Sequence, residues 1–187
     1  MNVNAHPLPS RHRFTVEDYH RLGEIGVLSE DDRVELIEGE IIDLAPIGTQ
    51  HAETLRKLIR ALASHLPPEA LLDVRDPIRI GGSEPQPDIA IIRNRSYVDV
   101  HPGPEDVLLL IEVADTSLEF DRSIKIPLYA RHGIPEVWLI DLAGRAVEVF
   151  RDPAAEGYRD VRRYGPAGRI RPVLIPELEV DLAAVLA

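Results

Sequence analysis

Three polar residues occupy positions that hydrophobic packing alone does not explain. Asp88 opens the apolar run 88–92, and Glu112 lies inside the apolar run 107–114. Lys125 follows in a segment with helical spacing. An unpaired charge buried in such a run costs on the order of several kcal/mol. We therefore expect a cation beside Glu112, either a metal ion or Lys125.

These residue types suit the hydrolysis of phosphodiester bonds. Two carboxylates on adjacent strands can bind Mg²⁺, which retains several water ligands and also coordinates the phosphate of a substrate. A bound divalent ion lowers the pKa of water and neutralises charge on phosphate oxygens, while a lysine orients the water or stabilises the transition state. The alternative is a structural ion pair between Glu112 and Lys125, with Asp88 as a turn residue at a strand end. Spacing alone slightly favours this alternative.

Length and composition indicate one globular domain. The 187 residues include no Cys, which excludes disulfides, thiolate metal sites and a Cys nucleophile. No signal-peptide pattern opens the sequence and no apolar run approaches the roughly 20 residues of a membrane span, so we expect a cytoplasmic protein. A net charge of −11 argues against a large non-specific nucleic-acid surface. We expect residues 1–13 to form a flexible arm and residues 14–187 a single domain.

Local signals predict a small helix and a hairpin ahead of the main sheet. Thr15 and Asp18 have the spacing of a capping box, which predicts a short helix over 15–23. Gly39 separates two mostly apolar runs, which predicts a hairpin over 34–44.

The middle of the chain alternates between helical and strand patterns. A long amphipathic helix begins at His51 and ends before a Pro-Pro pair, because proline cannot continue it. Residues 71–80 predict one strand that precedes the two apolar runs described above. Between those runs, residues 94–106 predict a surface loop.

The second half of the chain predicts a further helix and several strands. Asp121 can cap a helix that ends near Gly133, and Pro127 predicts a kink or a delayed start within it. Strands are predicted over 136–141, 146–150 and 158–164, with a closing segment over 175–186. This order of elements is typical of a mixed sheet with a helix on each face.

Several short motifs occur together in an order that resembles one known family. They are Glu35–Glu40, His51, Gln86–Ala90, Leu110–Ser117, Asp121, Lys125, Tyr129 and Gly133–Asp141. In this combination the chain is similar to the Uma2 family of restriction endonuclease-like proteins, from about Phe14 to the segment 177–182. The resemblance implies the PD-(D/E)XK nuclease fold, an α/β (mixed α+β) architecture with a mixed central sheet flanked by helices. An extra N-terminal helix and β-hairpin would precede this core.

The resemblance also implies an endonuclease that uses Mg²⁺ or Mn²⁺ and acts on nucleic acid, with DNA the expected substrate. Asp88 matches the acid of the Pro-Asp motif and Glu112 the second acid, while the backbone carbonyl of Val113 is implied as a further metal ligand. The broad superfamily often has a lysine two residues after the second acid, where this chain has Ala114. In this family the lysine comes from the next helix, which indicates Lys125. Nucleases that cut both strands are often two-fold symmetric, so we expect a homodimer.

Other polar residues near these motifs have two interpretations each. His51 could contact metal-bound water or phosphate, but a half-exposed histidine at a helix end is equally expected. Glu35 could complete an acidic cluster, or be a solvated or arginine-paired strand residue. We expect Asp121 to cap a helix, and Thr116 and Ser117 to form turn hydrogen bonds rather than phosphate contacts.

The remaining candidates are interpreted mainly as structural. Trp138 and Tyr129 are expected in the core, and Asp141 at a strand end. The local basic residues could contact phosphate or be solvated; they are Arg56, Lys57, Arg60, Arg93 and Arg95. Six histidines show no spacing typical of a metal site: His6, His12, His20, His65, His101 and His132.

Three functional hypotheses follow from the sequence. The first is a metal-dependent nuclease in which Asp88 and Glu112 hold Mg²⁺ and Lys125 serves the attacking water. The second is a non-catalytic descendant of the same fold that acts as a binding or accessory module. The polar triad favours the enzyme, whereas the acidic composition favours the second hypothesis or an enzyme that needs a partner to bind nucleic acid. In the third, the acidic pocket binds metal for structure alone.

Overall fold

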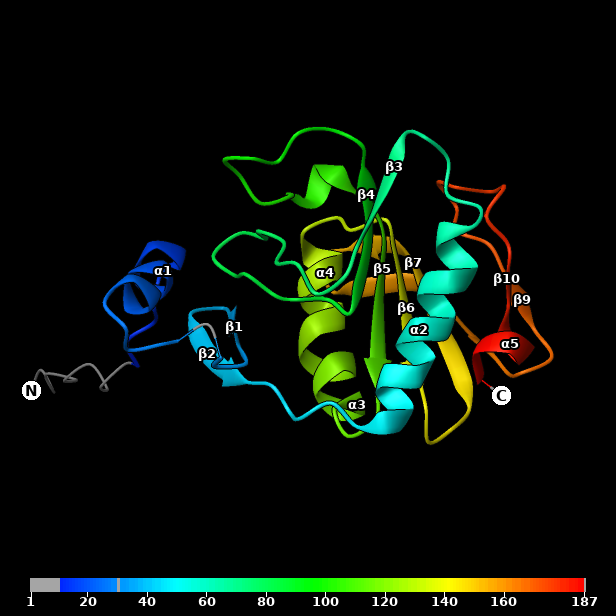
Figure 1. Ribbon diagram of the computed structural model, residues 1–187, viewed down its shortest axis with the longest axis horizontal. Coiled ribbons are helices and arrows are strands. Elements are labelled where there is room, and N and C mark those ends of the chain that lie inside the picture. Colours follow the sequence, from blue (N-terminus) through cyan, green and yellow to red (C-terminus); the bar gives the residue numbers. More distant parts are fainter. Residues whose placement is uncertain (1–10, 30, 187) are drawn as a thin grey trace, which may run out of the picture.

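A six-stranded sheet forms the centre of the protein in the computed structural model, which describes residues 11–29 and 31–186 (Figure 1). The strands lie in the order β3-β4-β5-β6-β7-β8. Their bounds are Ala70–Asp73, Ile89–Arg93, Val107–Ala114, Glu136–Asp141, Ala146–Ala154 and Gly157–Tyr164. Neighbouring strands are antiparallel except β5 and β6, which are parallel. The predicted mixed sheet is confirmed, and the strand predicted over 158–164 is the edge strand β8.

Helices cover both faces of this sheet. Parallel strands require a crossover connection, and the chain between β5 and β6 crosses one face as a continuous helical run. This run consists of α3 (Leu118–Phe120), the π-type turn η2 (Asp121–Lys125) and α4 (Ile126–Arg131). Helix α2 (Thr49–Ala63) covers the opposite face. The crossover therefore carries Lys125 back over the sheet that holds Glu112.

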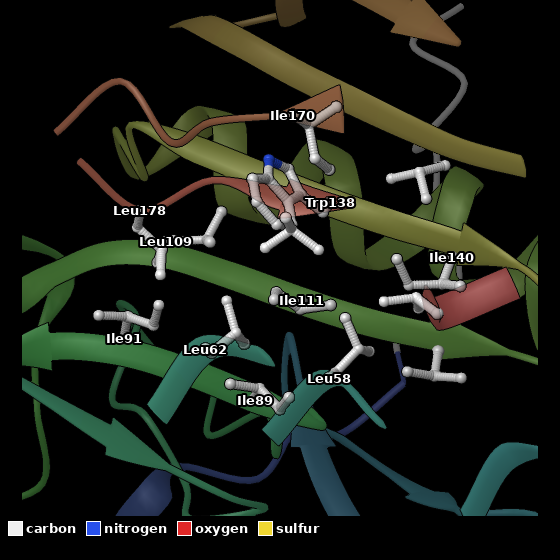
Figure 2. Packing of buried hydrophobic residues seen from close by; sticks show 14 of the residues in the cluster. Leu58, Leu62, Ile89, Ile91, Leu109, Ile111, Trp138, Ile140, Ile170 and Leu178 are labelled. Carbon is white, nitrogen blue, oxygen red and sulfur yellow. The ribbon is translucent and has the colours of Figure 1, made fainter. Parts of the chain in front are cut away.

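Two hydrophobic cores lie on the two faces of the sheet. Because side chains alternate along a strand, Leu109 and Ile111 of β5 face α2, whereas Leu110 faces α4. Figure 2 shows Leu58 and Leu62 of α2 against the first of these faces. The expected core position of Trp138 is confirmed, since its side chain is fully buried in the same cluster.

The predicted N-terminal helix and hairpin are both present. Helix α1 (Val16–Glu24) begins with the capping box of Thr15 and Asp18. Strands β1 (Val34–Ile37) and β2 (Glu40–Asp43) form an antiparallel pair. Their turn requires positive φ at two successive residues, 47° at Glu38 and 80° at Gly39, which is the geometry of a tight hairpin turn. Residues 1–10 of the predicted arm lie outside the described residues.

The prediction of one strand over 71–80 is wrong. Strand β3 ends at Asp73, and Arg75 has a φ of 62°, in the left-handed region that interrupts an extended chain. Ile80 forms only an isolated bridge with Ser83. The apolar residues after Arg75 belong instead to a loop that crosses toward β1.

The predicted start of the crossover helix at Asp121 is also wrong. The helical run begins after Ser117, which is its N-cap, and Asp121 lies inside the run. Pro127 has no backbone N–H to donate within a helix. A π-type turn of five residues precedes it and keeps the run continuous, in place of the predicted kink or delayed start.

The C-terminal segment closes the core on the α2 side. It contains β9 (Arg169–Ile170), β10 (Val180–Asp181) and α5 (Leu182–Leu186), and α5 packs against α2. The predicted loop between β4 and β5 contains a single 3₁₀ turn, η1 (Pro104–Asp106). None of the helices in the described part of the chain has the length and apolar character needed to cross a membrane.

Candidate active site

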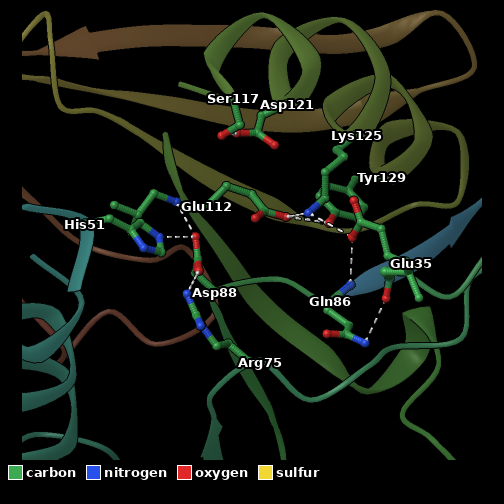
Figure 3. A network of polar contacts seen from close by, with 12 residues as sticks. Glu35, His51, Arg75, Gln86, Asp88, Glu112, Ser117, Asp121, Lys125 and Tyr129 are labelled. Carbon is green, nitrogen blue, oxygen red and sulfur yellow. Dashed lines mark hydrogen bonds and ion pairs between the residues drawn. The ribbon is translucent and has the colours of Figure 1, made fainter. Parts of the chain in front are cut away.

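A cavity of about 560 Å³ lies beside the carboxyl end of β5, lined also by the first turn of α2, the crossover helices and the β1–β2 hairpin. Asp88, Glu112 and Lys125 all line it (Figure 3). Asp115 and Thr116 line it too and are exposed, so water can reach the cavity. The structure therefore brings together the three residues that the sequence singled out.

Glu112 faces the crossover helices because of the alternation along β5. Leu110 and Ala114, two residues to either side, belong to the core between the sheet and α4. Glu112 itself is only 3% exposed. Lys125 provides the cation that such a buried carboxylate needs, with Nζ 2.8 Å from Oε1 of Glu112.

Lys125 is the last residue of the π-type turn η2 and is held between two carboxylates. Its ammonium lies 3.4 Å from Oε2 of Glu35 as well as beside Glu112. Burial alone would lower the pKa of Lys125, but the charges of Glu112, Glu35 and Asp121 outweigh burial and raise it. Lys125 is therefore protonated at neutral pH and is available as a positive charge rather than as a base.

Several carboxylates crowd around this one ammonium group. Burial raises the pKa of Glu112 to about 8, Lys125 opposes the shift, and the charges of Asp121, Asp88 and Glu35 add to it. Burial also raises the pKa of Asp121. The cavity thus concentrates negative charge that a divalent cation would offset. Strongly shifted pKa values of this kind are common at functional sites.

Three donors orient the carboxylate of Asp88. Because β4 begins at Ile89, the N–H of Val113 lies beyond the end of the β4 ladder, and it donates to Oδ2 of Asp88 at 2.9 Å. Nε2 of His51 lies 3.0 Å from the same oxygen, and Nη2 of Arg75 lies 3.4 Å from Oδ1. His51 is buried in the first turn of α2, so the half-exposed alternative is wrong.

Glu35 joins the same cluster from the hairpin. It is 0% exposed, and its Oε2 accepts a hydrogen bond from the backbone N–H of Gln86 at 3.0 Å. Its Oε1 is buried without a hydrogen-bond partner among the described residues. Glu35 is therefore part of the acidic cluster, where it meets Lys125, and not a solvated or arginine-paired strand residue.

Tyr129 contributes more than the core packing that the sequence indicated. Its ring is fully buried, but its hydroxyl donates to Oε1 of Glu112 at 2.6 Å. Tyr129 lies four residues after Lys125, and residues four apart share one face of a helix. This spacing is the signal that links Tyr129 to the site.

Arg75 and Asp121 also take part in ways that local patterns do not show. Arg75 lies in the loop after β3 and reaches Asp88 only through the fold. Asp121, expected as a cap, instead accepts a hydrogen bond from the Ser117 hydroxyl at 2.6 Å and lines the cavity. No sequence spacing connects Arg75 with the Pro-Asp motif.

The basic residues proposed from the sequence for phosphate contact do not line the cavity. Arg95 pairs with Asp106 at 2.6 Å, and Nε of Arg93 donates to the carbonyl of Glu105, so both stabilise the loop after β4. Within the described part of the chain, the arginine and lysine residues that line the cavity are Arg33, Arg75 and Lys125.

Comparison with family models assigns most of the chain to one protein family. The model of a family described as "Uma2: Putative restriction endonuclease" matches residues 16–184. Among curated proteins, none matches the chain. The predicted family resemblance is confirmed by the match of the family model.

Solved structures support the fold. One that is similar, from Anabaena variabilis, is described as "a putative nuclease belonging to DUF820". The superposition has a TM-score of 0.74 and covers 92% of this chain and 97% of the other, at 18% sequence identity. The expected nuclease-like architecture is therefore confirmed at the level of the fold.

Proposed function

The chain belongs to the Uma2 family, and from this membership and the geometry of the cavity we propose that it is a metal-dependent endonuclease that hydrolyses nucleic-acid phosphodiester bonds. One observation carries the proposal: Asp88, Glu112 and Lys125 line a single cavity, with the ammonium 2.8 Å from Glu112. A simple structural ion pair needs one carboxylate for one ammonium. Here Glu35 and Asp121 are added to the pair, at a cost in stability that binding of a cation would offset.

The residues present fit a hard divalent cation. Carboxylate and carbonyl oxygens are ligands that Mg²⁺ and Mn²⁺ prefer, and the buried, unpartnered Oε1 of Glu35 adds a further acceptor. Asp88, Glu112 and the backbone carbonyl of Val113 are the groups that would hold the ion. When bound, such an ion lowers the pKa of a water molecule and offsets charge on phosphate oxygens.

The chain's own side chains supply the remaining chemistry. Lys125, kept protonated by its carboxylate neighbours, orients the attacking water and stabilises negative charge that develops on the phosphate. His51 and Arg75 hold Asp88 in place. Arg33 and Arg75 line the cavity and are the residues that we expect to contact the substrate backbone.

The substrate that we propose is DNA, bound with modest affinity. The net charge of −11 means that few phosphates can be neutralised by the protein, so binding depends mainly on the cavity. Cleavage should therefore be measured at low ionic strength first.

A cleavage assay with matched variants tests this proposal. Purified protein is mixed with plasmid and single-stranded DNA in the presence of Mg²⁺, Mn²⁺ or EDTA, and the assay is repeated with Asp88→Ala and Lys125→Ala. We expect metal-dependent cleavage that falls at least about a hundredfold in both variants. Arg159→Ala, at an exposed position on the edge strand β8, serves as the control and should cleave like the wild type.

The outcomes separate the three hypotheses. Equal nicking by the wild type and both site variants would identify a contaminating nuclease and overturn the proposal. Intact DNA together with metal binding that Asp88→Ala abolishes would favour a structural metal. Intact DNA that is nevertheless bound by the protein would favour the non-catalytic accessory module.

A further inference from the structure

A second group of metal-binding side chains lies outside the cavity, where α1 meets two loops of the core. Nε2 of His20 lies 2.8 Å from Oε1 and 3.0 Å from Oε2 of Glu84. The ring of His101 lies 6.2 Å from that of His20. One ligand atom from each residue lies within 4.8 Å of the other two. Three segments that are distant in the sequence thus converge on one point.

Glu84 is the fixed and buried member of this group. Its side chain is 5% exposed, and its backbone N–H donates to the carbonyl of Leu36 at 2.7 Å, which fixes the residue against β1. Among the described residues, both carboxylate oxygens are hydrogen-bonded to the same nitrogen of His20, and no lysine or arginine lies within ion-pair distance. The only ion-pair partner of this buried carboxylate among the described residues is therefore His20, which carries a charge only when it is protonated, and a buried carboxylate without a permanent counter-charge is costly. A cation shared with the two histidines would remove that cost.

The two histidines can adjust to such a cation. The side chain of His20 is 43% exposed, and His101 is exposed in the loop after β4. Ligand atoms around a tetrahedral ion with bonds of about 2.0–2.1 Å lie roughly 3.4 Å apart. The present separations are within reach of that value by rotation of exposed imidazole rings, while Glu84 stays in place.

We propose that His20, Glu84 and His101 form a site for a transition metal, with Zn²⁺ the preferred ion. Two imidazole nitrogens and one carboxylate oxygen are a recurring set of three zinc ligands, with water in the fourth position. The site differs in chemistry from the all-oxygen set around Asp88 and Glu112, which suits Mg²⁺ or Mn²⁺. The two sites should therefore select different ions.

The metal would tie the N-terminal helix to the core. Among the residues of α1, Val16 alone is buried, so apolar contacts hold this helix weakly. Figure 1 shows α1 set apart from the layers of the sheet, beside the β1–β2 hairpin. The proposed ion would link α1 with the loops on both sides of β4.

Metal binding by the full chain, free of any affinity tag, tests the proposal. The Asp88→Ala background is used so that the cavity does not add a second site, and Zn²⁺ binding is followed by calorimetry and Co²⁺ binding by its visible absorption. We expect one ion per chain with a tetrahedral Co²⁺ spectrum. His20→Ala, His101→Ala and Glu84→Gln should each weaken binding by at least about tenfold to a hundredfold, because loss of even an outer-shell partner of a metal ligand costs this much.

His65→Ala is the matched control, because His65 is exposed beyond the end of α2 and outside the group. It should bind Zn²⁺ like its parent. Zn²⁺ should also slow hydrogen exchange in α1 in the parent but not in His101→Ala. Because His101 is exposed, its replacement leaves the packing of the fold intact, and a loss of binding reports on the metal site. Unchanged Co²⁺ spectra in His20→Ala and His101→Ala, or no binding by the parent, would overturn the proposal and leave the nuclease proposal untouched.

Discussion

Two buried glutamates on neighbouring parallel strands differ in how their carboxylates are hydrogen-bonded and paired. Glu112 lies on β5 and Glu136 on β6, and both are almost completely buried. The carboxylate of Glu136 accepts hydrogen bonds from the Trp138 indole, the Arg151 guanidinium and the backbone N–H of Val173, at 2.6, 2.8 and 2.7 Å. These donors use both of its oxygens and join β6, β7 and the C-terminal segment.

The surroundings of Glu112 have the opposite character. Both of its hydrogen-bonded or ion-paired neighbours, Lys125 and Tyr129, meet the same oxygen, Oε1, and further carboxylates lie close by. Glu136 therefore stabilises the fold, whereas Glu112 is held in an environment that disfavours its charge. Such local conflict is expected where a site has been arranged for chemistry rather than for stability.

The largest expected contrast is in catalysis. Under the proposed function, Glu112→Gln should lower DNA cleavage at least about a hundredfold, because it removes a metal ligand and the partner of Lys125. Glu136→Gln should leave cleavage per folded molecule near the wild-type value, since this residue does not line the cavity. Initial rates on supercoiled plasmid check this, and similar losses in both variants would remove the distinction between the two glutamates.

For stability we expect the opposite order, with the larger loss on substitution of Glu136. Glu136→Ala leaves the Arg151 guanidinium and two other donors without their acceptor, and should lower the free energy of unfolding by about 3 kcal/mol. At pH 5, where the buried Glu112 carboxyl group is protonated and as uncharged as an amide, Glu112→Gln should change it by no more than about 1 kcal/mol, because Lys125 keeps Glu35 as a partner and the amide still accepts from Tyr129. Urea unfolding in EDTA measures both values. A larger loss in Glu112→Gln would make Glu112 the structural residue.

A third contrast concerns pH. Folding raises the pKa of Glu112 from 4.5 to about 8, so between these values the folded state binds more protons than the unfolded state. The free energy of unfolding should therefore fall as pH rises from about 5 to 8. Urea unfolding of the metal-free protein across this range should show a shallower decline in Glu112→Gln than in the wild type. Equal pH profiles for the two proteins would contradict the assignment.

The smallest expected effect is at Tyr129. Tyr129→Phe removes one hydrogen bond to Glu112 and keeps the buried ring, so cleavage should fall between about twofold and tenfold. Stability should change by about 1 kcal/mol or less. Tyr158→Phe is the matched control, because the Tyr158 hydroxyl donates to the carbonyl of Ile134 outside the cavity. Its cleavage rate should equal that of the wild type, and a loss equal to that of Tyr129→Phe would indicate a general packing effect.

Local patterns in the sequence predicted most of the architecture. The capping box at Thr15, the hairpin around Gly39 and the two apolar strands that carry the acids all depend on contacts between near neighbours. The failed predictions have local causes as well. Arg75 adopts a left-handed φ that its residue type does not suggest. The crossover helix begins after Ser117, before the expected cap at Asp121, because the π-type turn that precedes Pro127 keeps the helical run continuous.

Only some residues of the candidate site could be predicted from the sequence. Asp88, Glu112 and Lys125 were singled out because charges in apolar runs need partners. The contacts of Arg75 and of the His20–Glu84 pair had no such signal, because the partners are 13 and 64 residues apart in segments without periodicity.

The order of residue types is enough to assign the apolar face of each strand, because the two-residue repeat depends only on neighbouring side chains. Which charged side chains come into contact depends on the three-dimensional fold. The crossover between parallel strands carries Lys125 to Glu112, and the hairpin brings Glu35 to the same ammonium. These contacts depend on how whole helices and strands pack, and the distances that result cannot be derived from the order of residue types.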